Sequence, residues 1–192
     1  MISSQLFHYA GWSAYLSAVA TIIGFVTIIT FFSMGEPFGT INDISSVVIA
    51  LSTLPILFAL YQLHRPVAPI ASPVALVIGI LAILVAAVFQ TLLIIKVIAY
   101  AQTAVTVSAS FGIFGASLIA FGYLARTNEL QPRRLAYLSI IAGAGYVMVI
   151  AGFLLGGQEN AITTIGGLIA VICYPIWAIL FGRLLLSGKL AA

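Results

Sequence analysis

Six long apolar stretches, separated by short polar breaks, are the feature that most constrains how this chain can fold. Each stretch has about 20 residues or more, the length that a helix needs to cross about 30 Å of hydrocarbon at a rise of about 1.5 Å per residue. The expected spans are residues 11–32, 44–63, 73–98, 103–125, 135–155 and 163–186. The sequence therefore predicts an all-α membrane bundle of six transmembrane helices, with residues 1–192 forming one domain.

The composition agrees with this prediction. Charged residues make up 6% of the 192 residues and hydrophobic residues 63%, whereas a soluble domain has about 25% charged residues to cover its surface. A soluble globule, a disordered chain and a nucleic-acid-binding domain are therefore excluded. The apolar stretches are also continuous, without the alternation typical of membrane β-strands, so helices are expected.

Helix-breaking residues define the connections between the expected spans. A glycine and proline cluster at 35–39 predicts a turn, and Asn42 or Asp43 is expected to cap the second helix. Three prolines within 65–73 predict a stiff connector, because proline disfavours helix around it. The remaining polar connections are 126–134 and 156–160. All connections are short, so no catalytic domain outside the membrane is expected.

The charges are distributed unevenly between the two sides of the predicted bundle. Six of the seven bases lie in the segments after the second, fourth and sixth spans or in the helix ends beside them: Arg65, Arg126, Arg133, Arg134, Arg183 and Lys189. The other side carries three acids, Glu36, Asp43 and Glu159, and a single base, Lys96, which is expected to anchor at the interface. The positive-inside rule then predicts that both termini lie in the cytoplasm.

The even-numbered spans show a weak similarity at an interval of about 60 residues. Pro55, Gly115 and Pro175 occupy matching positions, and an aromatic residue follows each of them six residues later. Such spacing is typical of parallel repeats related by an axis along the membrane normal, here three helical hairpins. In a chain this rich in apolar residues the matches also arise by chance, so both interpretations stay open.

No Asp, Glu, His, Lys or Arg falls in the middle of an expected span. Ionisable groups inside a membrane are costly and usually serve a mechanism, so their absence argues against proton-coupled transport. The two histidines and the single cysteine lie on separate segments, which does not provide the three ligands and the base of a zinc hydrolase. We therefore expect neither an enzyme nor a metal site, and we predict no cofactor beyond a possible pigment or bound lipid.

Three polar residues are the candidates for contact with a pigment or another lipophilic ligand. His8 and His64 are expected at the cytoplasmic interface, where imidazole serves either as an anchor or as an axial metal ligand. Gln90 is the deepest strongly polar side chain, and an interhelical hydrogen bond is its more ordinary role. For each residue the structural role and the binding role are both kept as alternatives.

Small residues at intervals of four predict close contacts between helices. The fourth span contains Ser108, Gly112 and Ala116 at this spacing, and the fifth contains Gly143 and the pair Gly152 and Gly156. Small side chains allow two helix backbones to approach closely in a membrane. These stripes are expected either to pack the six helices together or to dock a partner protein, a pigment or a lipid tail.

The closing segment 174–185, with its Tyr-Pro-x-Trp and Gly-Arg-Leu elements, resembles the last helix of an uncharacterised bacterial family of small six-helix membrane proteins. The resemblance covers about the last twenty residues and implies the fold and a bacterial inner membrane. It implies no activity.

Two functions fit these observations. The first is a non-catalytic integral membrane subunit that packs against other membrane proteins or lipids in a larger assembly, such as a respiratory or photosynthetic complex. The alternative is a binder or transporter of a small neutral lipophilic molecule, with a cavity lined by Gln90, Thr106, Ser108 and Tyr146.

Overall fold

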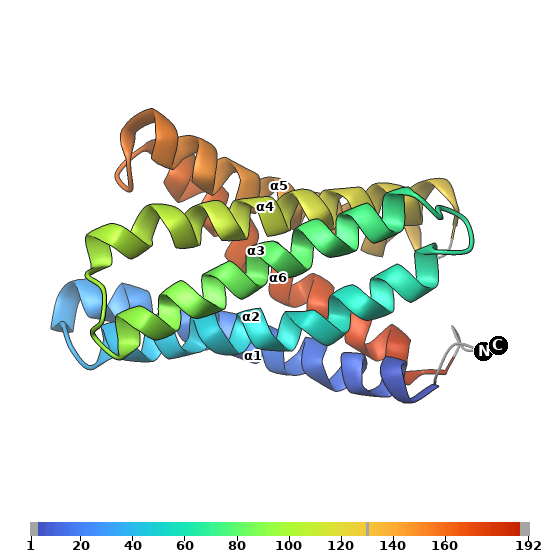
Figure 1. The fold of residues 1–192 in the computed structure, drawn as a ribbon, viewed down its shortest axis with the longest axis horizontal. Helices are drawn as coiled ribbons and strands as arrows, with labels where there is room; N and C mark the ends of the chain where they lie inside the picture. Colours follow the sequence, from blue (N-terminus) through green and yellow to red (C-terminus); the bar gives the residue numbers. More distant parts are fainter. Residues whose placement is uncertain (1–3, 130, 189–192) are drawn as a thin grey trace.

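The structure is a computed structural model that describes residues 4–129 and 131–188. Six helices follow one another: α1 (Ser4–Met34), α2 (Phe38–His64), α3 (Ala71–Ile94), α4 (Tyr100–Thr127), α5 (Arg133–Gly156) and α6 (Ala161–Leu186). No strand occurs in the described ranges. The predicted all-α bundle of six helices is therefore confirmed (Figure 1).

Each helix is long and apolar enough to cross a membrane. Their outer faces carry large apolar side chains exposed on the surface of the bundle, including Trp12, Leu16, Leu51, Leu81, Ile141 and Ile176. Apolar exposure on this scale is what a surface in contact with lipid tails shows, and it is unfavourable in water. The chain is therefore an integral, multi-pass membrane protein.

The helices run alternately up and down and close into a ring. Each one packs against the next in sequence, and α6 packs back against α1. A smaller contact joins α2 directly to α4, so α3 lies on the outside of the seam between these two helices. In Figure 1 the turns α1–α2, α3–α4 and α5–α6 lie together at the left, and the other two turns lie at the right with the start of α1 and the end of α6.

These two ends of the bundle are named here by one residue each. The Glu36 end contains the turns α1–α2, α3–α4 and α5–α6, and the Arg65 end contains the other two turns. Arg65, Arg126, Arg133, Arg134 and Arg183 lie at or next to the Arg65 end, whereas Lys189 lies outside the described residues. The charge asymmetry noted in the sequence is thus an asymmetry between the two ends of the ring.

The start of α2 differs from the prediction. The helix begins at Phe38, directly after Pro37, so Asn42 and Asp43 lie inside it and do not cap it. The capping role belongs to Glu36, whose Oε2 accepts hydrogen bonds from the backbone N–H of Thr40 (3.2 Å) and from its hydroxyl (2.9 Å). A carboxylate at a helix start satisfies one of the free N–H groups and complements the helix dipole.

Three other helix limits also differ. α1 begins at Ser4 rather than at residue 11, because residues 4–10 contain no glycine or proline that would break the helix. α3 begins at Ala71, two residues before the predicted start at Pro73, and a proline in the first turn removes an N–H that has no intrahelical partner in any case. The same helix ends at Ile94 rather than at residue 98. It cannot continue through Lys96, because the backbone of that residue adopts a φ of 61°, which a helix does not allow.

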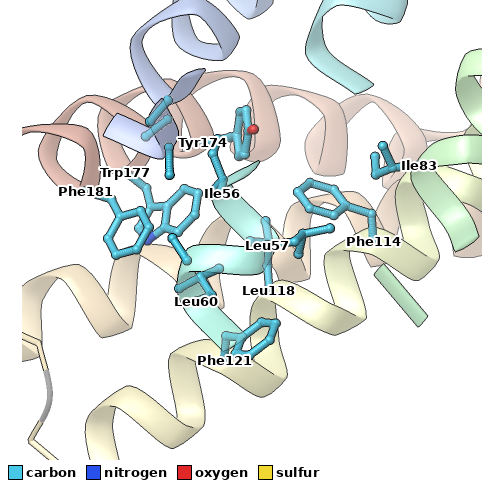
Figure 2. Close-up of a cluster of buried hydrophobic side chains, with 14 of the residues drawn as sticks. Ile56, Leu57, Leu60, Ile83, Phe114, Leu118, Phe121, Tyr174, Trp177 and Phe181 are labelled. Atoms are coloured by element: carbon cyan, nitrogen blue, oxygen red, sulfur yellow. The ribbon is translucent and has the colours of Figure 1, made fainter. Parts of the chain in front are cut away.

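Most of the largest fully buried side chains in the described core lie in the half of the ring toward the Arg65 end. Here the rings of Tyr174, Trp177 and Phe181 on α6 follow one another along the helix, and all three are fully buried. Figure 2 shows them facing Leu57 and Leu60 of α2 and the side chains of α4. This aromatic and aliphatic layer, together with Leu118 and Phe121 of α4, is called the plug below.

A hydrogen-bonded chain fixes Tyr174 between three helices. The hydroxyl of Thr53 donates its one hydrogen to the carbonyl of Ile49 (2.7 Å), so Tyr174 must be the donor in its 3.0 Å contact with Thr53. The hydroxyl of Ser17 lies 2.7 Å from that of Tyr174 and is left as the donor to it. Ser17, Thr53 and Tyr174 thereby join α1, α2 and α6 through fully oriented bonds.

Replacing Tyr174 with Phe should lower the free energy of unfolding by about 1 kcal/mol, because two buried hydrogen bonds are lost. The change should appear as a lower midpoint of thermal unfolding for the purified protein in a single detergent. Tyr123→Phe is the matched control, since Tyr123 is 57% exposed on the outer surface of α4. Equal midpoints for the two variants would contradict the structural role given to the Tyr174 hydroxyl.

Candidate functional site

A cavity occupies the middle of the helix ring. Two adjoining spaces of about 210 and 250 Å³ share five lining residues, Thr21, Ser46, Phe111, Tyr146 and Val171. The shared residues come from α1, α2, α4, α5 and α6, and none comes from α3, which agrees with its position outside the seam. The space is therefore lined by the five helices that form the inner ring.

A third space adjoins this cavity on the side of the Glu36 end. It has a volume of about 350 Å³, and it shares Ile28 and Asn42 with the inner space. Glu36, Asp43 and Tyr100 line it close to the turns of this end. The three adjoining spaces are together called the half-channel, because they lead from the Glu36 end to the middle of the ring.

The inner wall of the half-channel is aromatic. Phe111 and Tyr146 stack with their ring centroids 5.8 Å apart and their planes 18° from parallel. Below them, Phe114 and Tyr174 each meet the Tyr146 ring edge to face, at 5.7 and 5.8 Å. Aromatic walls of this kind bind apolar or cationic groups and give a pocket a fixed shape.

Two hydroxyl groups in this wall are free to meet a ligand. Within the described ranges no hydrogen bond reaches the side-chain oxygen of Ser108 or Tyr146, although both residues line the inner space. The other two hydroxyls in the wall are already used, because Thr21 donates to the carbonyl of Ser17 (2.8 Å) and Ser46 to that of Asn42 (3.1 Å). A few free polar groups in an apolar wall are typical of small-molecule sites.

The plug closes the half-channel toward the Arg65 end. Trp177 and Phe181 stack with their centroids 5.2 Å apart and their planes 11° from parallel. The ring of Phe121 continues this layer and contacts the ring of His64 at 5.6 Å. None of these four side chains lines the half-channel, and all are fully buried. The plug therefore separates the half-channel from the Arg65 end.

The mouth of the half-channel carries two carboxyl groups. Gln90 of α3 donates from Nε2 to Oδ1 of Asp43, a distance of 2.6 Å, and Glu36 caps α2 as described above. In the described part of the chain the one ion pair joins Arg133 to Glu129, which lie at the opposite end. Neither carboxyl group of the mouth is therefore paired with a base.

Tyr100 completes the mouth and ties it to the neighbouring turn. Its hydroxyl donates to Oε1 of Gln158, 2.9 Å away, which links the start of α4 to the α5–α6 turn. Its side chain lines the mouth together with Phe31 of α1 and Leu93 of α3. Aromatic side chains with a polar tip are well suited to this position between water and the apolar interior.

The structure brings only part of the predicted ligand set together. Ser108 and Tyr146 line the inner space as the alternative function required. Thr106 instead faces the outer groove between α3 and α4, because a shift of two residues turns a side chain to another face of the helix. Gln90 lies at the mouth and forms the interhelical hydrogen bond that was its more ordinary expected role.

Asp43 is the functional candidate that the sequence analysis missed. Taken as a cap of α2, it was assigned to the surface, whereas it lies inside the helix and faces Gln90. The useful signal was the spacing from Pro37, since a helix that begins at a proline places Asp43 more than one turn inside. Two polar residues at the same depth of two adjacent apolar spans are natural partners.

The two histidines do not share a site with Gln90. His8 is exposed on α1 and contacts the ring of Tyr9 at 6.4 Å. His64 is fully buried at the end of α2, so its expected position as an anchor at the interface is wrong. Its Nδ1 lies 2.7 Å from the carbonyl oxygen of Leu60 and donates to it, while Nε2 is buried with no partner in the described structure. Both histidines lie toward the Arg65 end, and Gln90 lies toward the Glu36 end.

Most of the predicted small residues lie between helices of the bundle itself. A Cβ atom on Gly112 would meet Ile150 of α5, one on Gly143 would meet Gly115 of α4, and one on Gly152 would meet Thr163 of α6. Ser108 lines the half-channel, Ala116 is exposed on the outer surface, and Gly156 faces the side chain of Asn160 in the α5–α6 turn.

No group of three or more His, Cys, Asp or Glu side chains gathers to hold a metal within residues 4–129 and 131–188. Lys96 is exposed in the α3–α4 turn.

Comparisons with protein-family models, with curated proteins and with solved structures give no match to this chain. The family suggested by the last helix therefore stays a prediction.

Proposed function

We propose that this protein binds a small, largely lipophilic molecule inside the half-channel. The observation that carries the proposal is a preformed space in the middle of the ring, lined by the stacked rings of Phe111 and Tyr146 and by free hydroxyls. Ligand sites are typically concave, mostly apolar and supplied with a few polar groups, and in helix bundles they lie between the helices. A cavity of this kind has no evident use in a purely structural subunit.

The position of the space along the bundle supports transport as the purpose of binding. Tyr146 is ten residues from the end of α5 at Gly156, about 15 Å along the helix axis. The inner space therefore ends near the middle of the bundle, where substrate sites of transporters lie. Passage would require the plug around Trp177 and Phe181 to open, and we propose binding as the step that precedes it.

The charge asymmetry supports an orientation for this function. With the basic Arg65 end in the cytoplasm, the half-channel opens away from the cytoplasm, and both termini lie on the cytoplasmic side of a bacterial inner membrane. A molecule would then be taken up from the outer side or from the outer leaflet.

A role as a subunit of a larger membrane assembly is retained as a second proposal, because one outer surface favours it. An apolar groove of about 550 Å³ between α3 and α4 is lined by Ile78, Leu81, Val85 and Val105, together with Thr106. A lipid tail or a helix of a partner protein would fit such a groove. The glycines, by contrast, give little support to this role, since they are used within the bundle.

Replacing Gly167 with Val should abolish most of the binding of a neutral lipophilic probe. Gly167 lines the inner space, and a Cβ atom there meets nothing within 4 Å, so the larger side chain fills the cavity without a clash. The probe is N-phenyl-1-naphthylamine, whose fluorescence rises when it leaves water. In lipid nanodiscs the native protein should add a saturable signal to that of the lipid, and the variant should weaken the apparent affinity about tenfold.

Ala116→Val is the control for this experiment, because it adds bulk to an exposed position on α4 that faces away from the cavity. It should bind the probe as the native protein does. If the native protein adds no saturable signal, or if both variants bind the probe equally well, the proposed function is wrong.

A further inference from the structure

We propose that the molecule bound in the half-channel is an organic cation, such as an amine or a quaternary ammonium compound with a small apolar body. The inference rests on the proposed function, and it replaces the neutral ligand expected from the sequence. It adds a charge requirement that comes from the mouth of the half-channel rather than from its inner wall.

The first argument is the balance of charge at the mouth. Glu36 and Asp43 both line the outer space, and no basic side chain lines any of the three spaces of the half-channel. Among the described residues, the one base at this end of the bundle is Lys96, which is exposed in the α3–α4 turn and forms no ion pair with either acid. Glu159, in the α5–α6 turn, adds a further negative charge to this end.

A negative field at the mouth of an apolar space selects by charge. Carboxylates that face a space with low-dielectric walls attract a cation more strongly than they would in water, and they repel an anion. Asp43 is positioned for this role, because it lines the mouth and no base pairs with its carboxyl group in the described structure. A neutral molecule of the same shape gains nothing from either carboxyl group.

The second argument is the arrangement of aromatic rings along the half-channel. Phe31 and Tyr100 line the mouth beside Asp43, and Phe111 and Tyr146 line the inner space. The faces of aromatic rings attract ammonium groups, and the same rings also accept an apolar body. A ligand with its positive charge near Asp43 and its apolar part against Phe111 would satisfy both ends of the half-channel.

The test uses two ligands that have the same shape and differ in charge. Benzyltrimethylammonium and neopentylbenzene share one skeleton, with a charged nitrogen in the first where the second has a carbon. Each is used to displace N-phenyl-1-naphthylamine from the protein in nanodiscs, and the free concentrations are corrected for partition into lipid. The cation should displace half of the probe at about a tenfold lower free concentration than the neutral compound.

Two variants locate the source of the preference. Asp43→Asn keeps the shape of the side chain and a partner for Gln90, and it should remove most of the preference for the cation. Glu36→Gln should reduce the preference further when it is added to the first change. Glu159→Gln is the control, since Glu159 does not line the half-channel, and it should leave the preference almost unchanged.

The possible results separate this inference from the proposed function. If the probe binds but the two ligands displace it equally, or if Asp43→Asn keeps the full preference, the ligand is not selected as a cation, while the cavity remains a binding site. If the probe itself shows no saturable binding, the proposed function fails first and the inference fails with it.

Discussion

Replacing Gly143 with Val is expected to prevent the stable assembly of α4 and α5. A Cβ atom at this position would meet the carbonyl oxygen of Gly115, and it would lie 3.0 Å from the backbone nitrogen of Ile119. Both groups belong to the backbone of α4, so they cannot move aside as a flexible side chain does. Because α4 and α5 share one of the most extensive helix contacts in the ring, we expect a loss of about 3 kcal/mol or more.

The measurement is the yield of monodisperse protein in mild detergent and its midpoint of thermal unfolding. Gly167→Val is the matched control, because it makes the same substitution where nothing lies within 4 Å of the new Cβ atom. That variant should fold as the native protein does, whereas Gly143→Val should be largely aggregated or unfold at a much lower temperature. Similar behaviour of the two variants would show that α4 and α5 do not approach as closely as the structure places them.

The number of helices and their order could be predicted from the sequence because the membrane imposes a length on each apolar stretch. The limits of the helices were less predictable where proline is involved. Pro37 was interpreted as part of a turn, whereas α2 begins directly after it, and proline is well tolerated at a helix start. The misplaced start of α2 then concealed Asp43, since a residue taken as a cap is assigned to the surface.

The half-channel depends on information that a single sequence does not contain. Its lining comes from five helices, and the rotation of each helix about its axis decides which side chains meet there. Apolar residues surround most of these helices, so the pattern gives little indication of which face points inward. Ser108 and Tyr146 were correctly selected as polar residues at a suitable depth, and Thr106, selected on the same ground, lies on the outside.

His64 illustrates the same limit at the other end of the bundle. Its place at the end of an apolar span indicated an anchor at the interface, but its side chain is fully buried and its ring contacts that of Phe121. The burial of His64 depends on how α2 packs against α4, which the sequence does not indicate. The spacing of the small residues, in contrast, carried real information about close contacts, because Gly112, Gly143 and Gly152 lie where neighbouring helices approach.

The account depends most on the claim that water reaches the middle of the ring from the Glu36 end and stops at the plug. Two serines on α4 can report on this claim. Ser108 lines the half-channel, whereas Ser117, nine residues further along, is buried and donates to the carbonyl of Ala75 at 2.8 Å. Each is changed to cysteine in a protein whose own Cys173 has been replaced by Ala.

The measurement is the rate at which iodoacetamide, a small uncharged reagent that dissolves in water, modifies each cysteine in the folded protein. The Ser108→Cys protein should react at least about a hundredfold faster than the Ser117→Cys protein, because the second site is reached only when the bundle opens locally. N-phenyl-1-naphthylamine should slow the reaction at position 108 and leave the other rate unchanged. Equally slow modification at both positions would show that the half-channel is closed to water, which would contradict the account.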